Sequence, residues 1–77
     1  NNSLYDTVLV SANDELVSQF LNNNISYKDI NVLINKILNF KEFRQLKRKI
    51  PQNINEIVNL NKYVRLKTLD LCIKDRN

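Results

Sequence analysis

The sequence contains no glycine, no histidine, no tryptophan and no methionine, and it has one proline and one cysteine among its 77 residues. The absence of glycine excludes a P-loop, a GxGxxG dinucleotide turn and a nucleophile elbow, since each needs glycine for a positive φ or for close approach of the backbone. A lone Cys72 cannot form an internal disulfide, and without histidine it cannot build a structural zinc site. This cysteine usage suits a reducing compartment.

Longer sequence signals are missing as well. No apolar run approaches the ~20 residues that span a bilayer. The first residues, NNSLYDTVLV, lack the positive start and the apolar stretch of a signal peptide. The chain does not begin with Met, which predicts that it is cut from a longer protein. Its length allows one domain at most, with a modest core.

The first part of the chain predicts an extended segment followed by a helix. Residues 1–10 are expected to be an extended lead-in. Ser11 or Asn13 then caps a helix whose first turn holds Asp14 and Glu15, where the helix dipole favours them. Apolar residues at helical spacing form one stripe: Ala12, Leu16 and Phe20, flanked by Val17 and Leu21.

Three asparagines and a capping box predict a turn and a second helix. The asparagines at 22–24 end the first helix, because asparagine tolerates the left-handed conformation. Ser26 and Asp29 have the spacing of a capping box, and Ile25 and Ile30 flank them as a hydrophobic staple. The second helix is predicted over about 27–39 from its regularly spaced apolar residues, Ile30, Leu33, Ile34, Ile37 and Leu38.

The next stretch leaves two interpretations open. Residues 40–50 either prolong the second helix or form a separate basic turn, and Pro51 ends any helix before it. Asn53 and Glu56 have the spacing of another cap, and a short turn over 54–58 is expected to follow.

These patterns predict an all-α fold, a small antiparallel bundle of three to four helices over residues 11–77. Asn61 is expected to cap the last helix, over roughly 62–74, whose apolar face comprises Val64, Leu66, Leu69, Leu71 and Ile73. The expected core residues are Phe20, Leu21, Ile30, Leu33, Ile34 and Ile37. Replacing Phe20 with Ala is expected to cost about 3–5 kcal/mol.

No group of residues predicts chemistry, so no catalytic, cofactor-binding or metal-binding residue is assigned. Asp14 and Glu15 are adjacent and therefore point about 100° apart on a helix. Asp70 and Asp75 lie on a basic helix and are expected to be solvated. Cys72 stands among apolar residues near a helix C-terminus, which disfavours a thiolate and predicts a small core residue.

The net charge of +4 is unevenly placed, because the stretch KEFRQLKRK at 41–49 holds five cations against Glu42. These cations are the candidate partner-contact residues: Lys41, Arg44, Lys47, Arg48 and Lys49. Phe40 and Phe43 interleave with them, as on an RNA-binding surface. An anionic membrane is a further alternative, with only a thin apolar face to support it. One hypothesis is therefore a stand-alone helical interaction module that contacts an acidic protein surface or, less favoured, nucleic acid.

A second hypothesis comes from residues 12–30, which read A-N-D-x-L-V-x-x-F-L-x-x-x-I-x-Y-x-D-I. This stretch resembles the C-terminal domain of the 1-deoxy-D-xylulose 5-phosphate reductoisomerase family, which carries L-N-A-A-N-E-x-x-V-x-x-F-L and then I-x-[FY]-x-D-I. INEIV at 54–58 looks like the family's L-D-E-V-L, and Val64-Arg65 is similar to its closing A-R. The matching residues of the first stretch are Leu9, Ala12, Asn13, Val17, Phe20, Leu21, Ile25, Tyr27, Asp29 and Ile30.

The resemblance implies an enzyme for the intact family. NADPH and a divalent metal serve to isomerise and reduce deoxyxylulose phosphate to methylerythritol phosphate, in isoprenoid precursor synthesis in the plastid (apicoplast) or the cytoplasm. The NADPH-binding domain, the metal-binding carboxylates and the substrate loop belong to earlier parts of the family chain. This chain is then expected to be a non-catalytic piece of a helical bundle that braces the catalytic domain. Its partner is that domain or another protein, and a homodimer is left open.

Two departures from the family pattern leave the interpretation open. Val10 stands where the family has Asn, and Ser11 follows it. The segment 39–50 is longer and more basic than the resemblance implies. The chain is therefore either part of a diverged enzyme or a paralogue that kept the bundle and lost the enzyme.

Overall fold

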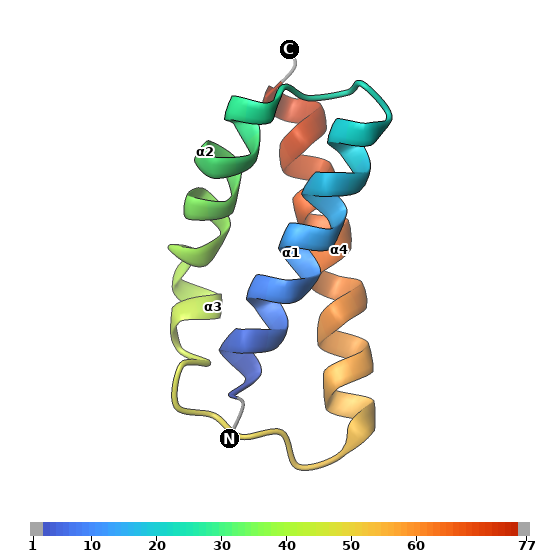
Figure 1. Cartoon of the computed structure of the whole chain (residues 1–77). Helices are drawn as coiled ribbons and strands as arrows, with labels where there is room; N and C mark the ends of the chain where they lie inside the picture. The colour runs from blue at the N-terminus through green and yellow to red at the C-terminus, as the bar shows by residue number, and fades with distance from the viewer. Residues whose placement is uncertain (1–2, 76–77) are drawn as a thin grey trace.

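A computed structural model of the chain describes residues 3–75 and contains four helices in that part (Figure 1). Helix α1 spans Leu4–Leu21, α2 spans Tyr27–Leu38, α3 spans Lys41–Arg44 and α4 spans Ile54–Asp75. The described residues include no strand. The all-α fold class predicted from the sequence is confirmed.

Helix α1 begins at Leu4, so the extended lead-in predicted for residues 1–10 is wrong over the part that the structure describes. Ser3 is the N-cap residue. The carboxylate of Asp6 accepts a hydrogen bond from the Ser3 backbone N–H at 3.1 Å. This contact satisfies an amide donor and places a negative charge at the positive end of the helix dipole.

The residues predicted to start this helix lie in its middle. Ser11 is buried, Asn13 is exposed, and neither caps the helix. Asp14 and Glu15 are therefore not first-turn residues. The prediction failed because β-branched residues before position 11 have low helix propensity. Packing of α1 along most of α4 outweighs that propensity.

The asparagine turn and α2 agree with the prediction. Asn23 adopts a φ of 63°, in the left-handed region. Ser26 Oγ accepts a hydrogen bond from the Asp29 backbone N–H at 3.3 Å, and Asp29 Oδ2 accepts one from the Ser26 N–H at 2.9 Å. Ile25 and Ile30, the predicted staple, pack against the same core cluster. The bounds of α2 match the predicted helix to within one residue.

Residues 40–50 form a separate basic turn and do not prolong α2. Phe40 has extended backbone angles, which end the path of α2, and α3 is a single turn. The predicted cap of the next helix is confirmed, because Asn53 Oδ1 accepts a hydrogen bond from the Glu56 backbone N–H at 3.0 Å. The Glu56 carboxylate accepts a second one from the Gln52 N–H at 2.6 Å.

Helix α4 is continuous, so the predicted turn over 54–58 and the predicted cap at Asn61 are wrong. The helix contains no glycine or proline that would interrupt its hydrogen bonds. Leu66 and Ile73, which were assigned to its apolar face, are exposed. Its fully buried residues recur at a four-residue spacing instead: Val64, Thr68 and Cys72.

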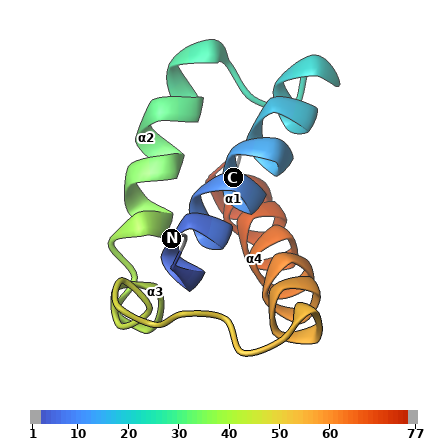
Figure 2. The same cartoon turned by 60° about the horizontal axis from the view of Figure 1, so that its bottom comes forward.

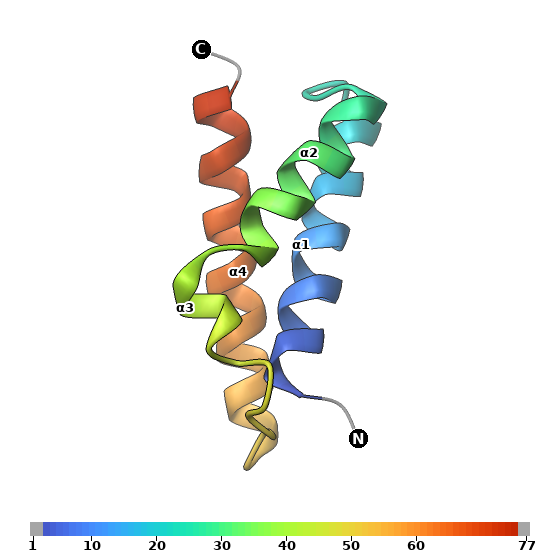
Figure 3. The same ribbon diagram turned by 90° about the vertical axis from the view of Figure 1, so that its left-hand side faces the viewer.

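The three long helices run up, down and up. Figure 1 shows α1 and α4 rising side by side in the same direction, while α2 descends antiparallel to both. Figure 2 shows the chain after α3 crossing the lower end of the bundle to reach α4. In Figure 3, α3 lies in front of the lower half of α4, and side chains of the two helices bridge the space between them. The predicted antiparallel arrangement therefore holds for α2 against its neighbours, whereas α1 and α4 are parallel.

The core lies between the long helices, and α3 contributes Phe43 to it at the lower end. Of the six predicted core residues, the four on α2 are buried or half-buried. Phe20 is half-buried, and the prediction for Leu21 is wrong because 71% of it is exposed. The buried residues form one cluster of Val8, Ala12, Ile37, Phe43 and Val64, and a second of Leu16, Leu33 and Cys72.

Candidate interaction surfaces

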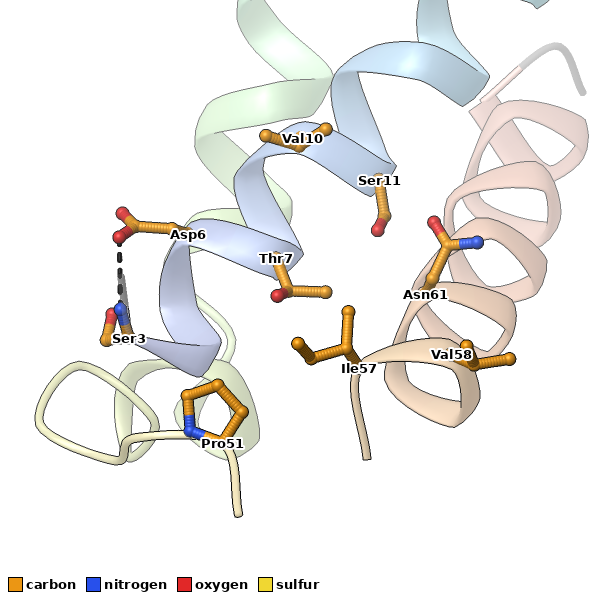
Figure 4. A pocket seen from close by; sticks show the side chains of 9 residues that line it. All are labelled: Ser3, Asp6, Thr7, Val10, Ser11, Pro51, Ile57, Val58 and Asn61. Carbon is orange, nitrogen blue, oxygen red and sulfur yellow. Dashed lines mark hydrogen bonds between the residues drawn. The ribbon is translucent and has the colours of Figure 1, made fainter. Parts of the chain in front are cut away.

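A groove of about 400 Å³ separates the lower ends of α1 and α4. Figure 4 shows Thr7 of α1 and Ile57 of α4 on its two sides, with Pro51 below them. Asp6 supplies its charged group, and that carboxylate is already hydrogen-bonded to the backbone of Ser3. The remaining apolar wall comes from Val10 and Val58.

Short side chains at the contact between the two helices leave this groove open. Ser11 of α1 and Asn61 of α4 face each other across it (Figure 4). Among the described residues, no buried side-chain polar atom lacks a hydrogen-bond partner. The groove therefore offers a mainly apolar surface.

Exposed apolar side chains extend the groove along both helices. On α1, Val10, Val17 and Leu21 are spaced by seven and four residues, which places them on one face, and they are 59%, 37% and 71% exposed. On α4, Ile54 and Val58 are 69% and 41% exposed. We name the groove with these five residues the α1–α4 valley. Because α1 is apolar on its outer side as well as its inner side, it has the pattern of a helix covered on both sides.

Polar residues interrupt and border the valley. Asp14 is exposed and lies on the same face of α1 as the valley residues, four positions after Val10 and seven before Leu21. Glu15 and Arg65 join α1 to α4, with 3.2 Å between a carboxylate oxygen and the arginine Nε. An exposed apolar surface with a polar rim is typical of a site that binds another protein element.

A hydrogen-bonded group ties α3 to α4. The carboxylate of Glu42 lies 2.7 Å from Lys67 Nζ and accepts a hydrogen bond from the Tyr63 hydroxyl at 2.8 Å. The hydrogen bond from Lys67, followed by that from Tyr63, lowers the pKa of Glu42, and the same bond raises the pKa of Lys67. Lys67 Nζ also lies 5.3 Å from the centre of the Phe40 ring. This group fixes the position of α3.

The five predicted contact cations are all exposed, on α3 and the turn that follows it: Lys41, Arg44, Lys47, Arg48 and Lys49. None of them forms an ion pair with a carboxylate of residues 3–74. Lys47 Nζ lies 5.3 Å from the centre of the Tyr5 ring. Phe43 is buried and Phe40 is half-buried, so the aromatic rings of this segment face the core. Contact of the cations with a partner stays a prediction.

The remaining candidates are dispersed. Within the described part of the chain, no three His, Cys, Asp or Glu residues gather in a way that holds a metal ion. Asp70 pairs with Lys74 at 3.1 Å on an exposed face, and the side chain of Asp75 lies outside the described residues.

Cys72 is 1% exposed, so its prediction as a core residue is confirmed. No helix among the described residues has the length and hydropathy to cross a membrane.

Sequence reasoning found the basic segment but missed the valley. The valley depends on α1 starting at Leu4 and α4 starting at Ile54, and both helices were predicted to begin later. A signal was present in the helical spacing of Val10, Val17 and Leu21 beside the buried stripe. No sequence signal linked Glu42 to Lys67, because their contact depends on how α3 lies on α4.

An up–down–up bundle with an exposed apolar valley between two parallel helices defines an all-α domain. The model of the DXP reductoisomerase C-terminal domain family matches residues 1–67. The chain therefore belongs to this family, as the resemblance at residues 12–30 indicated.

A relative supports the same assignment. The 1-deoxy-D-xylulose 5-phosphate reductoisomerase of Pelagibacter ubique (strain HTCC1062) is 49% identical to this chain over 71 residues. That match covers 92% of this chain and 18% of the relative, so the chain spans less than a fifth of the relative's length. No solved structure matches the chain.

Proposed function

We propose that this chain is the C-terminal helical scaffold of a 1-deoxy-D-xylulose 5-phosphate reductoisomerase and that it braces the rest of the enzyme without contributing catalytic groups. The observation that carries the proposal is the 49% identity to such an enzyme over 92% of the chain. The parent enzyme would act in isoprenoid precursor synthesis, in a plastid or in the cytoplasm.

The α1–α4 valley supports the bracing role. It leaves large apolar side chains such as Val10 and Leu21 in contact with water. Full burial of one such side chain is favourable by about 1.5–3 kcal/mol. Covering the valley with another part of the parent polypeptide would therefore stabilise both parts.

The described residues do not fit NADPH or a divalent metal. The chain has no glycine to form a dinucleotide-binding turn. Its described carboxylates do not gather into a set of metal ligands. We assign both groups, and the chemistry that they supply, to other parts of the parent enzyme.

A matched pair of substitutions in the full-length parent polypeptide tests the proposal. Val10→Asp places a charge in the valley, whereas Val32→Asp places the same charge on α2, at a valine of similar exposure, 51% against 59%. We expect Val10→Asp to lower NADPH-dependent turnover of deoxyxylulose phosphate and the melting temperature, with Val32→Asp close to wild type.

Two results would contradict the proposal. Equal behaviour of the two variants would show that the valley is not a docking face. A wild-type parent polypeptide without this turnover would favour the paralogue that lost the enzyme.

A further inference from the structure

One segment accounts for the whole net charge of the chain. Residues 41–49 hold five of the twelve Lys and Arg residues and one of the eight acidic residues, so the rest of the chain has seven of each sign. The excess within this segment therefore equals the net charge of +4. We name its five cations the basic patch: Lys41, Arg44, Lys47, Arg48 and Lys49.

The carboxylates of the described acidic residues at this end of the bundle have partners other than the basic patch. Glu42 is bonded to α4 through Lys67. Asp6 and Glu56 accept hydrogen bonds from backbone N–H groups at the starts of α1 and α4. Both of those helices begin at the end where α3 lies (Figure 1), so their positive dipole ends also face it. Among the described residues, no carboxylate forms an ion pair with a cation of the basic patch.

The turn that carries the patch is held in place. The Leu4 backbone N–H donates to the Lys49 carbonyl at 2.7 Å, which fixes the end of the segment to α1. Phe43 anchors the segment to the core, because this residue is 1% exposed. Lys41, Arg44 and Lys47 line a shallow hollow together with the side chains of Asn39 and Gln45. Cations and amides around one hollow are donors suited to carboxylates, and the arginine can bind one with two hydrogen bonds.

The surroundings of the patch discriminate between partners. Single-stranded nucleic acid is bound by stacking bases on exposed aromatic faces. Here Phe43 is buried, and Phe40 packs against the core with Lys67 over its ring. A membrane surface needs an apolar face on the segment that carries the cations, yet Leu46 packs against the core and Ile50 is the one exposed apolar residue within 41–50. A carboxylate-rich protein segment needs neither rings nor apolar contacts.

We propose that the basic patch binds an acidic segment of another protein, whose carboxylates pair with Lys41, Arg44 and Lys47. This surface is separate from the docking face of the proposed scaffold, since the residues that line the two hollows do not overlap. The interaction therefore does not depend on the reductoisomerase assignment.

Fluorescence anisotropy of a labelled oligoglutamate peptide, titrated with the native polypeptide that carries this chain, tests the proposal. The double variant Lys41→Gln/Arg44→Gln removes two charges from the patch. We expect it to weaken binding about tenfold, since each exposed charge pair contributes up to ~1 kcal/mol. The control Lys28→Gln/Lys62→Gln removes the same charge from exposed positions on α2 and α4 and is expected to retain wild-type affinity.

Each other outcome overturns the proposal. Equal weakening by the two double variants would show a general effect of net charge. Tighter binding of duplex RNA, or of phosphatidylserine vesicles, through Lys41 and Arg44 would assign the patch to nucleic acid or to membrane. Failure of the native polypeptide to bind the peptide would show that the patch does not take up a carboxylate-rich segment.

Discussion

Lys67 Nζ lies 2.7 Å from a carboxylate oxygen of Glu42, and this pair joins the single turn of α3 to the long helix α4. Because the pair lowers the pKa of Glu42, it stabilises the fold above the unfolded value of 4.5, and this contribution is lost as the pH falls through the lower folded pKa. The pKa of Lys67 is shifted in the opposite direction, so its contribution to stability is lost at high pH. Its raised pKa gives stability that is complete below 10.5 and is lost as the pH rises through the folded pKa.

The substitution Glu42→Gln tests this pair. We expect a loss of less than about 1 kcal/mol in the free energy of unfolding at neutral pH, because the side chains of Lys67 and Glu42 are 37% and 40% exposed and solvent screens the pair. The difference from wild type should shrink below pH 4.5 and disappear once the pH is below the lowered folded pKa of Glu42, where the wild-type carboxyl is also neutral. Urea unfolding at neutral and acidic pH measures the difference in the free energy of unfolding between Glu42→Gln and wild type. A difference that stays constant with pH would refute the assignment, and Asp70→Asn serves as a control at a more exposed pair.

Phe43 is predicted to be the aromatic residue on which the lower core depends most. Its ring is buried and lies 6.1 Å and 6.0 Å, centre to centre, from Phe40 and Tyr63. Phe43→Ala should cost about 3–5 kcal/mol. Phe20 is half-buried and contacts the exposed ring of Tyr27, so Phe20→Ala should now cost less than that. Thermal unfolding followed by circular dichroism compares the two, and a larger loss for Phe20→Ala would contradict this ranking.

The cap of α4 gives a third prediction. Asn53→Ala removes the side-chain oxygen that accepts a hydrogen bond from the Glu56 N–H and should cost about 1 kcal/mol. Asn55→Ala, two residues on, replaces an exposed asparagine within the first turn and is expected to be neutral or slightly stabilising. Urea unfolding measures both. Equal effects would mean that the cap bond adds nothing to stability.

A hydrogen bond between α1 and the end of α2 gives a fourth prediction. The Tyr5 hydroxyl donates to the Leu38 carbonyl at 2.9 Å in a half-buried setting. Tyr5→Phe should cost about 0.5–1.5 kcal/mol, the usual net contribution of such a bond. Tyr27→Phe removes a hydroxyl from a residue that is 71% exposed and should have no measurable effect. The prediction fails if the two variants unfold at the same urea concentration.

Local signals predicted the parts of the fold that local contacts determine. The capping box at Ser26 and Asp29 located α2, and the pair Asn53 and Glu56 located the start of α4. Ser3 and Asp6 have the same spacing as the first of these pairs, but the β-branched run behind them favoured an extended segment. Asn61 was read as a cap, although it lies within α4 and faces α1.

Surfaces formed by two helices were less accessible to sequence reasoning. The basic patch is continuous in sequence, so composition alone was enough to find it. The α1–α4 valley combines Val10 with Val58 across a parallel pair of helices, and no pattern along the chain fixes which helices become neighbours. The contact between Glu42 and Lys67 was hidden for the same reason.

The parallel course of α1 and α4 also determines how this unit can be joined to other units. The first described residue and the last lie at opposite ends of a bundle that is 37 Å long (Figure 1). A circular permutant would therefore need a connecting peptide that runs the length of the bundle, roughly eleven extended residues. In such a bundle, the points where the chain enters and leaves are separated by about the length of the bundle.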